Sequence, residues 1–384
     1  MYIQDITSRS HGIIGADTSI AAFVGMALHG PVNEPTIIHG FYDFEKLFGG
    51  HREGSMMSYA VDGFFLNGGE KAIVVRLKDS NASNLEYDSF QQAFHALEKV
   101  PSFNLMCIPP ASRIQEIQPK IFQKALDLCN KKGAILIVDA PLSWGKSGID
   151  TITVVKKGLI DLGISGEQAR NAAMYFPSLS IPDPLKNNDP QLFAPCGAVA
   201  GIIAKTDRDH GVWKAPAGVN ASLHGIQQLQ IDLNDEQNQQ LNLMGVNCLR
   251  SFPSNGHVIW GAKTMWGASR IKDDYTYLPV RRTALFIEDS IKKGTEWVIF
   301  EPNDETLWSK IRHNVGVFMY DLFRAGAFAG SRPEEAYFVK CGRDTMNQND
   351  IREGLLNIIV GFAPLKPAEF IILKIQHPTG HVES

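Results

Sequence analysis

The sequence has little of what would assign a chain to a specialised class of protein. Its five cysteines are scattered over 384 residues without paired spacing. Neither a disulfide framework nor a zinc site is therefore expected, and such thiols are typical of a reducing cytosol. Neither charge sign is in large excess, because the net charge is only −4. We therefore expect no electrostatic binding of nucleic acid or of an anionic membrane.

Long apolar runs are missing as well. The longest one near the start, residues 20–28, is far shorter than the ~20 residues that span a bilayer. Residues 1–12, "MYIQDITSRSHG", lack the basic head and apolar middle of a signal peptide, so neither secretion by that route nor membrane insertion is expected. With 44% hydrophobic and 20% charged residues, the composition is that of an ordinary globular protein.

Short apolar strands alternate with amphipathic helices from Ser19 to about Asn247. "KAIVVRL", "FNLMCIPP" and "AILIVD" are typical of buried strands, whereas residues 87–100 and 114–133 have helical spacing. This alternation predicts an α/β fold with a mainly parallel sheet.

A second, smaller unit with α+β character is predicted from Val246 onward. Helices are expected over residues 279–294 and 303–326, and a strand over "EWVIF", residues 296–300. Three further strands should follow, the last being "AEFIILKIQ", residues 368–376. The predicted organisation is an N-terminal arm, an α/β domain, a second domain and a C-terminal arm with its tail, over residues 1–18, 19–245, 246–366 and 367–384.

The last predicted strand has two possible partners. Ile371, Leu373 and Ile375 fall on one face, and Lys366-Pro367 precedes the strand as a hinge. Such a strand can complete the sheet of its own chain or join the sheet of a neighbour. The residue pattern alone favours its own sheet.

One segment has the outline of a phosphate-binding loop. In "VDAPLSWGKSG", Ala140 to Ser147 follows an apolar strand and ends in Gly-Lys-Ser. This leaves a nucleotide-binding enzyme as an alternative function. However, Pro141 removes one backbone N–H, Trp144 adds bulk where phosphate should lie, and no later strand ends in an Asp for Mg²⁺. We favour a plain strand-to-loop junction.

No other pattern indicates an active site. Asp209 and His210 are adjacent, but a polar loop explains them better than an acid–base pair. We therefore predict no enzyme activity and no catalytic, cofactor-binding or metal-binding residues.

Four segments resemble the contractile tail sheath proteins of phage tails and of extracellular contractile injection systems. The family's middle domain is subtilisin-like in fold, but its Gly-Thr-Ser motif and the Asp and His partners are not recognisable here, so no protease activity is implied. The segments follow the family's order: "AAFVGMALHGPVNEPTIIHGFYDFEKLFGG" (21–50), "GAVAGIIAKTDRDHGVWKAPAG" (197–218), "GVNCLRSFPSNGHVIWGAKTM" (245–265) and the stretch from "YLPVRRTALF" to "AEFIILKIQ" (277–376).

The resemblance implies a structural protein whose copies stack in helical rings around an inner tube. Residues 19–245 would form the outer domain and residues 246–366 the inner one. The extended sheath would shorten when triggered and drive the tube through a target envelope, with its energy stored in subunit interfaces and no cofactor consumed. The implied partners are further copies, sheath paralogues, the tube protein, and baseplate and terminal cap proteins, but neither nucleic acid nor membrane.

The resemblance also implies where such a sheath belongs. Assembly would take place in the cytoplasm, as part of a phage tail or tail-like particle that can be released. The chain leaves no room for the protruding domains of longer relatives, which favours a compact phage-like, bacteriocin-like or extracellular injection-system sheath.

Both ends of the chain are implied to pair with neighbours. Family arms are exchanged as added strands, which shifts the expectation for both ends toward pairing between chains and makes residues 7–18 a tether. The residues concerned are Tyr2, Ile3 and Ile6 in the N-terminal arm and Phe370, Ile371, Ile372, Leu373 and Ile375 in the C-terminal arm.

A basic face on the long predicted helix is the expected contact with the tube. It consists of Lys310, Arg312, His313 and Arg324. Such a face suits an acidic tube surface and would set register more than affinity. A merely solvated helix face is the alternative.

Overall fold

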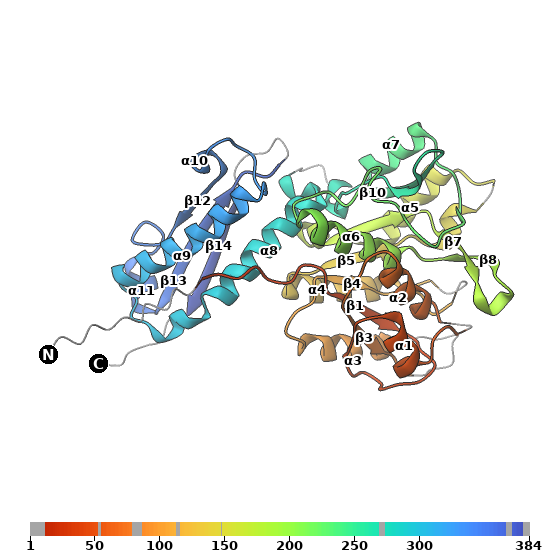
Figure 1. The fold of residues 1–384 in the computed structure, drawn as a ribbon, viewed down its shortest axis with the longest axis horizontal. Helices are drawn as coiled ribbons and strands as arrows, with labels where there is room; N and C mark the ends of the chain where they lie inside the picture. Colours follow the sequence, from red (N-terminus) through yellow and green to blue (C-terminus); the bar gives the residue numbers. More distant parts are fainter. Residues whose placement is uncertain are drawn as a thin grey trace. The chain divides into compact units, whose positions relative to one another are not determined.

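The computed structural model describes residues 12–52, 55–78, 87–112, 116–146, 148–268 and 273–365, together with the backbone of Ile371–Pro378. The chain forms two compact units (Figure 1). The larger unit is Asp17–Arg282, and the smaller unit combines Met1–Ala16 with Thr283–Ser384. None of the described helices is long and apolar enough to cross a membrane.

An eight-stranded sheet forms the centre of the larger unit. Its strand order is β11-β10-β6-β5-β4-β1-β3-β2, and only the two edge strands, β2 and β11, run antiparallel to their neighbours. The six central strands are parallel, as the alternation of strands and helices predicted. The bounds are β1 Ala21–Gly25, β2 Thr36–Ile38, β3 Ala72–Arg76, β4 Leu105–Cys107, β5 Ile135–Asp139, β6 Ala172–Phe176, β10 Val246–Phe252 and β11 Gly256–Ile259.

Helices cover both faces of this sheet, which explains why strands such as "ILIVD" are apolar throughout. Helices α3, α4, α5 and α7 pack on the face that carries Val24 and Leu136. Helices α1, α2 and α6 lie on the other face, where Phe64 of α2 meets Phe23 of β1. The bounds are α1 Phe41–Phe48, α2 Met57–Leu66, α3 Tyr87–Glu98, α4 Pro119–Lys132, α5 Thr151–Leu162, α6 Cys196–His210 and α7 Asp235–Leu243.

A second, antiparallel sheet belongs to the same unit. Its order is β8-β7-β9, with β7 Leu179–Asp183, β8 Asp189–Phe193 and β9 Gln228–Leu229. The five cysteines of the chain are all buried and free.

The smaller unit is a three-stranded antiparallel sheet with helices. Its order is β12-β13-β14, and the long helix α9 contacts β12. Helix α8 begins in the larger unit and continues into the smaller one. The bounds are α8 Leu278–Gly294, α9 Glu305–Arg324, α10 Pro333–Ala336, β12 Tyr337–Lys340, α11 Gln348–Arg352, β13 Leu355–Phe362 and β14 Ile371–Pro378.

The structure corrects the predicted domain boundary at residue 246. Strand β10, which begins at Val246, pairs with β6 in the middle of the large sheet, and β11 forms its edge. The boundary between the compact units falls between Arg282 and Thr283, inside α8. A continuous helix offers no Gly, Pro or polar linker, so the sequence carries no signal for this division.

The predicted strand over residues 296–300 is also wrong. These residues form one 3-10 turn, η6 Glu296–Phe300, directly after α8. Trp297 Nε1 donates to the Gly294 carbonyl, 3.0 Å away, and only Val298 of the five is buried. The apolar run therefore does not mark a strand, and it leaves the Phe300 side chain 87% exposed.

Candidate functional site

The phosphate-loop-like segment does not form a phosphate cradle. After β5 the chain turns through a short 3-10 helix, η1 Leu142–Gly145, and the Trp144 side chain is buried. A Cβ atom at Gly145 would lie 2.4 Å from Gln230 Cδ, and Gln230 Nε2 donates to the Leu142 carbonyl, 2.9 Å away. The backbone of this turn is therefore packed against the Gln230 side chain. In a phosphate-binding loop, the same backbone would instead point its N–H groups at a ligand.

The next helix is also unsuited to an anion. Helix α5 begins at Thr151, several residues after Lys146, and Asp150 caps it by accepting the Ile152 N–H at 3.2 Å. The hydrogen bond from the Thr153 hydroxyl holds the Asp150 pKa below its usual value. A carboxylate thus occupies the position at the helix N-terminus that would favour phosphate.

The residues at 209 and 210 do not form a catalytic pair. Asp209 accepts from Arg208 Nε, 3.3 Å away, and both Asp209 and His210 are exposed at the end of α6.

Helix α9 separates the four predicted tube-contact residues into two groups. Its buried face carries the apolar residues with helical spacing, as the sequence predicted. Lys310, His313 and Arg324 share one exposed stripe with Val317 and Tyr320, because these positions recur at intervals of three and four residues.

Arg312 lies on a different face of α9 and has partners within the smaller unit. Its Nη2 lies 2.6 Å from Glu305 Oε1, and its Nη1 donates to the Cys341 carbonyl. The side chain therefore ties α9 to the end of β12. We call Lys310, Val317, His313, Tyr320 and Arg324 the α9 stripe and leave Arg312 out of it.

The C-terminal strand lies in the sheet of its own chain. Strand β14 runs antiparallel to β13 over eight residue pairs, from Phe362↔Ile371 to Leu355↔Pro378. This is the arrangement that the residue pattern alone favoured, and it differs from the pairing with a neighbour that the resemblance implied. Strand β14 is the edge strand of this sheet.

The N-terminal segment is only partly described. Tyr2, Ile3 and Ile6 lie outside the described residues, as does Phe370 at the other end. From Gly12 onward the chain packs along α8: Ala16 N–H donates to Ser290 Oγ at 2.9 Å, and a Cβ atom at Gly15 would lie 3.1 Å from Phe286. Residues 12–16 of the predicted tether (residues 7–18) are therefore packed on α8 of their own chain, and residues 7–11 lie outside the described residues.

Sequence reasoning missed a buried ion pair in the larger unit. Arg282 of α8 forms two hydrogen bonds to Asp207 of α6, both 2.6 Å long, and both side chains are 3% exposed. Arg282 Nη2 also donates to the Thr18 carbonyl, 2.8 Å away. The pair joins three segments that are remote in sequence. Charged residues usually mark solvated faces, so nothing in the sequence distinguishes Asp207 and Arg282 from the other charged residues around them.

Two family models match most of the chain. The phage tail sheath protein central domain matches residues 81–265, and the phage tail sheath C-terminal domain matches residues 272–377. The tail sheath proteins of Vibrio phage KVP40 and Enterobacteria phage T4 are 28% identical over 139 residues and 26% identical over 136 residues. These alignments cover 36% and 35% of this chain, and the chain spans only 20% of each relative's length.

Solved structures resemble the chain over nearly its full length. The contracted helical sheath of the anti-feeding prophage is 29% identical, with a TM-score of 0.77 and 98% of each chain covered. The contracted sheath complex of the extracellular contractile injection system PVC is 26% identical, with a TM-score of 0.77, over 100% of this chain and 97% of that one. A chain of the anti-feeding prophage baseplate is 28% identical, with a TM-score of 0.72 and 98% of each chain covered.

Proposed function

This chain belongs to the phage tail sheath family, and from that premise we propose that it is the structural subunit of a contractile sheath. Its copies polymerise helically around an inner tube and contract to drive the tube through a target envelope. The observation that carries this proposal is the near-full-length likeness to two sheaths in the contracted state. The energy is stored in interfaces between subunits, so neither nucleotide nor cofactor takes part.

The family and the similar structures support a particle component that does not act as an enzyme. Its proposed partners are further copies of itself, sheath paralogues, a tube protein, and baseplate and cap proteins. The likeness to a chain of a baseplate structure supports the association with a baseplate. The sheath assembles in the cytoplasm as part of a phage tail or a tail-like particle.

The α9 stripe is the proposed contact with the tube. Lys310, His313 and Arg324 are exposed along one side of a helix whose opposite face is buried. Val317 and Tyr320 between them are 48% and 44% exposed, which adds apolar area to the same face. A basic stripe with an apolar centre is complementary to an acidic partner surface. Its charges would fix how the two surfaces align.

The arms are proposed to connect neighbouring subunits. Strand β14 lies at the edge of its sheet, where it pairs with β13. The same pairing can form between chains when β14 of one copy replaces that of the next, because the exchanged contacts are identical. Repeated in one direction, such an exchange is heterologous and builds an open helix, which is what a sheath requires.

Electron microscopy of the purified chain, alone and with its tube protein, tests this function. We expect striated hollow cylinders, whose inner diameter is uniform when the tube is present. Discrete globular particles under all assembly conditions, together with nucleotide hydrolysis that depends on Lys146, would instead support the nucleotide-binding enzyme.

A further inference from the structure

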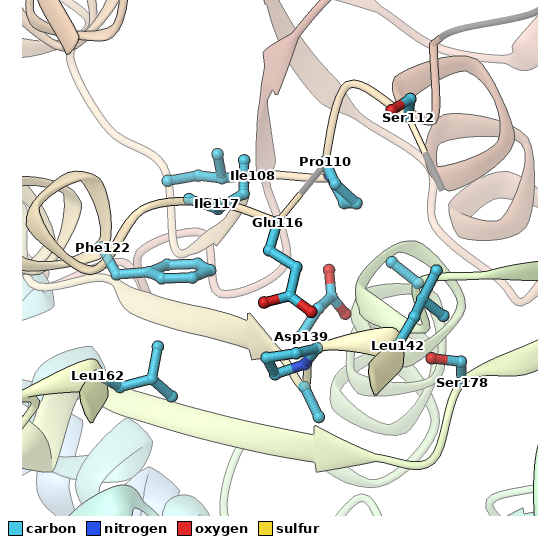
Figure 2. Close-up of a pocket in the computed structure, with 13 residues that line it drawn as sticks. Ile108, Pro110, Ser112, Glu116, Ile117, Phe122, Asp139, Leu142, Leu162 and Ser178 are labelled. Atoms are coloured by element: carbon cyan, nitrogen blue, oxygen red, sulfur yellow. The ribbon is translucent and has the colours of Figure 1, made fainter. Parts of the chain in front are cut away.

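A pocket opens at the carboxyl ends of three neighbouring parallel strands of the larger unit (Figure 2). Residues that follow β4, β5 and β6 form its walls, and this edge is where open α/β sheets bind ligands. Most of the lining is apolar, including Ile108, Ile117, Phe122, Leu142 and Leu162. Nothing in the proposed sheath function uses this pocket.

Asp139, the last residue of β5, brings a carboxyl group into this apolar lining. The residue is only 8% exposed. Its Oδ1 accepts the Cys196 N–H at the start of α6, 2.8 Å away, so this oxygen caps the helix. Its Oδ2 is buried without a hydrogen-bond partner in the described part of the chain. An unpartnered buried oxygen carries a desolvation cost that a bound donor would remove.

A second carboxyl group lines the same pocket. Glu116 and Asp139 both project into the space between the apolar walls in Figure 2. Glu116 is exposed, and its Oε1 accepts from Ser143 Oγ, 2.7 Å away. The pocket therefore combines a buried acid and an acid nearer solvent with apolar sides, which suits a cation on a hydrocarbon stem.

The number of free oxygens distinguishes between the possible cations. A guanidinium group binds carboxylates best through two parallel hydrogen bonds. Asp139 Oδ1 already accepts the α6 N–H, so a parallel pair of hydrogen bonds would have to share that oxygen, whereas Oδ2 has no partner among the described residues. An ammonium group is compact and acts as a point charge with three donors, so it can use a single oxygen while its alkyl stem packs on the walls.

We infer that this pocket binds a primary alkylammonium group, with the ammonium on Asp139 Oδ2 and the alkyl chain along Ile117, Phe122 and Leu162. The same chemistry occurs in a free alkylamine and in a lysine side chain of a second copy of this chain. The inference does not depend on polymerisation, because every residue that carries it belongs to one unit of one chain.

Calorimetric titration of the purified chain with n-pentylamine tests the inference, with n-pentanol as the uncharged control. At about pH 8.5 the amine is protonated and Asp139 is above its pKa of about 7, which burial raises from the ordinary value. We expect pentylamine to bind at least about tenfold more tightly than pentanol, and Asp139→Asn to abolish this preference. Asn keeps an acceptor for the Cys196 N–H, so the fold should survive.

Two further variants keep the test decisive. Asp189→Asn removes the same charge at an exposed position outside the pocket and should leave the preference unchanged. Ile117→Trp fills the apolar side and should weaken both probes without touching Asp139. The inference is overturned if pentylamine and pentanol bind wild type equally, or if Ile117→Trp binds both as wild type does.

Assembly in the presence of saturating pentylamine separates the two sources of the ammonium group. Polymerisation that pentylamine inhibits in wild type, and that Asp139→Asn weakens without any amine, assigns the pocket to a lysine of a second copy. Unchanged polymerisation with retained binding assigns it to a free amine. Both results require the binding that the titration measures.

Discussion

The ion pair between Asp207 and Arg282 should be the most costly single contact to break in the larger unit. Both side chains are 3% exposed, and two hydrogen bonds of 2.6 Å join them. Asp207→Ala leaves a buried guanidinium without its partner, which typically costs about 3–5 kcal/mol. Urea unfolding of the variant should show a loss of this size.

An exposed ion pair supplies the control for that measurement. Glu70 and Arg208 are 2.6 Å apart, but their side chains are 71% and 44% exposed. Glu70→Ala should therefore cost less than about 1 kcal/mol. Equal losses in the two variants would show that Asp207 and Arg282 do not hold α6, α8 and the Thr18 carbonyl together.

Asp139 should make the larger unit less stable as the pH rises. Burial raises its pKa to about 7 in the folded chain, partly offset by the hydrogen bond from Cys196, whereas its ordinary value is 3.8. The folded state therefore holds the proton more tightly, so the stability that this provides is complete below about pH 4 and is lost as the pH rises toward 7. The shift corresponds to a change on the order of 4 kcal/mol.

Comparison with Asp139→Asn isolates this effect from all other titrating groups. The amide does not ionise, so the unfolding free energy of wild type minus that of the variant should fall between about pH 4 and pH 7. A difference that stays constant over this range would mean that Asp139 ionises freely in the folded chain. The Cys196 thiol and the amide end of α6 adjoin this carboxyl, and Glu116 lines the same pocket.

At the scale of single residues, signals that depend on the local sequence were readable, and those that depend on tertiary contacts were not. Pro141 and Trp144 argued against a phosphate loop, and the structure adds the Asp150 cap and the packing of Gln230. Asp139 and Asp207 attracted no attention, because the importance of an acid depends on burial and partners supplied by remote segments. Arg312 lies on another face of α9 than the other three predicted contact residues, and its bond to the Cys341 carbonyl is a tertiary contact that the sequence does not reveal.

At the scale of elements, the α9 stripe gives a prediction for tube binding. Lys310→Glu with Arg324→Glu reverses two charges on an exposed face, so the helix should stay folded while contact with an acidic tube becomes repulsive. Each exposed pair is worth up to about 1 kcal/mol, and the effect repeats in every subunit of the polymer. Pull-down with the tube protein should fail, while sheath-only polymers persist.

The matched control lies on the preceding helix. Lys292→Glu with Lys293→Glu makes the same change of charge on α8, outside the stripe. This variant should still bind the tube. Equal loss of binding in both double variants would indicate a general charge effect, and unchanged binding in the first would remove the stripe from the interface.

Cysteine cross-linking tests the exchange of β14. Val360 and Leu373 are paired across β13 and β14, so Val360→Cys with Leu373→Cys places two thiols opposite one another. In assembled polymer we expect the disulfide to join different chains, which appears as ladders on non-reducing gels. In unassembled subunits it should form within one chain.

A pair out of register serves as the control for this experiment. Val360→Cys with Ile375→Cys is offset by two residues and should cross-link poorly in either state. If the in-register pair closes within single chains even in the polymer, β14 remains in its own sheet and the arm is not exchanged.

Elements with a strong local pattern were predictable, and the others show why a local pattern is not enough. The buried strands β3, β4 and β5 and the helix α9 match their predicted positions, because hydrophobic period and length agree. Helices α2 and α6 were missed. Most of their residues are buried, so neither shows an amphipathic stripe.

At the scale of the whole molecule, the parallel α/β class was predictable, but the division of the chain was not. The alternation of strands and helices fixed the class, whereas β10 and β11 return to the large sheet after an interval that resembles a linker. The structure describes a single chain, in which β14 can pair only with a strand of that same chain. Which partner it has in a polymer is a property of the assembly.

The central claim is that a polymer of this chain shortens without consuming nucleotide, and imaging before and after contraction tests it most directly. Tube–sheath particles are imaged by cryo-electron microscopy in nucleotide-free buffer, before and after acid or denaturant triggers contraction. We expect shorter, wider sheaths built from subunits whose larger and smaller units keep their folds. Sheaths whose length and diameter never change, or that shorten only when ATP is added, would contradict the account.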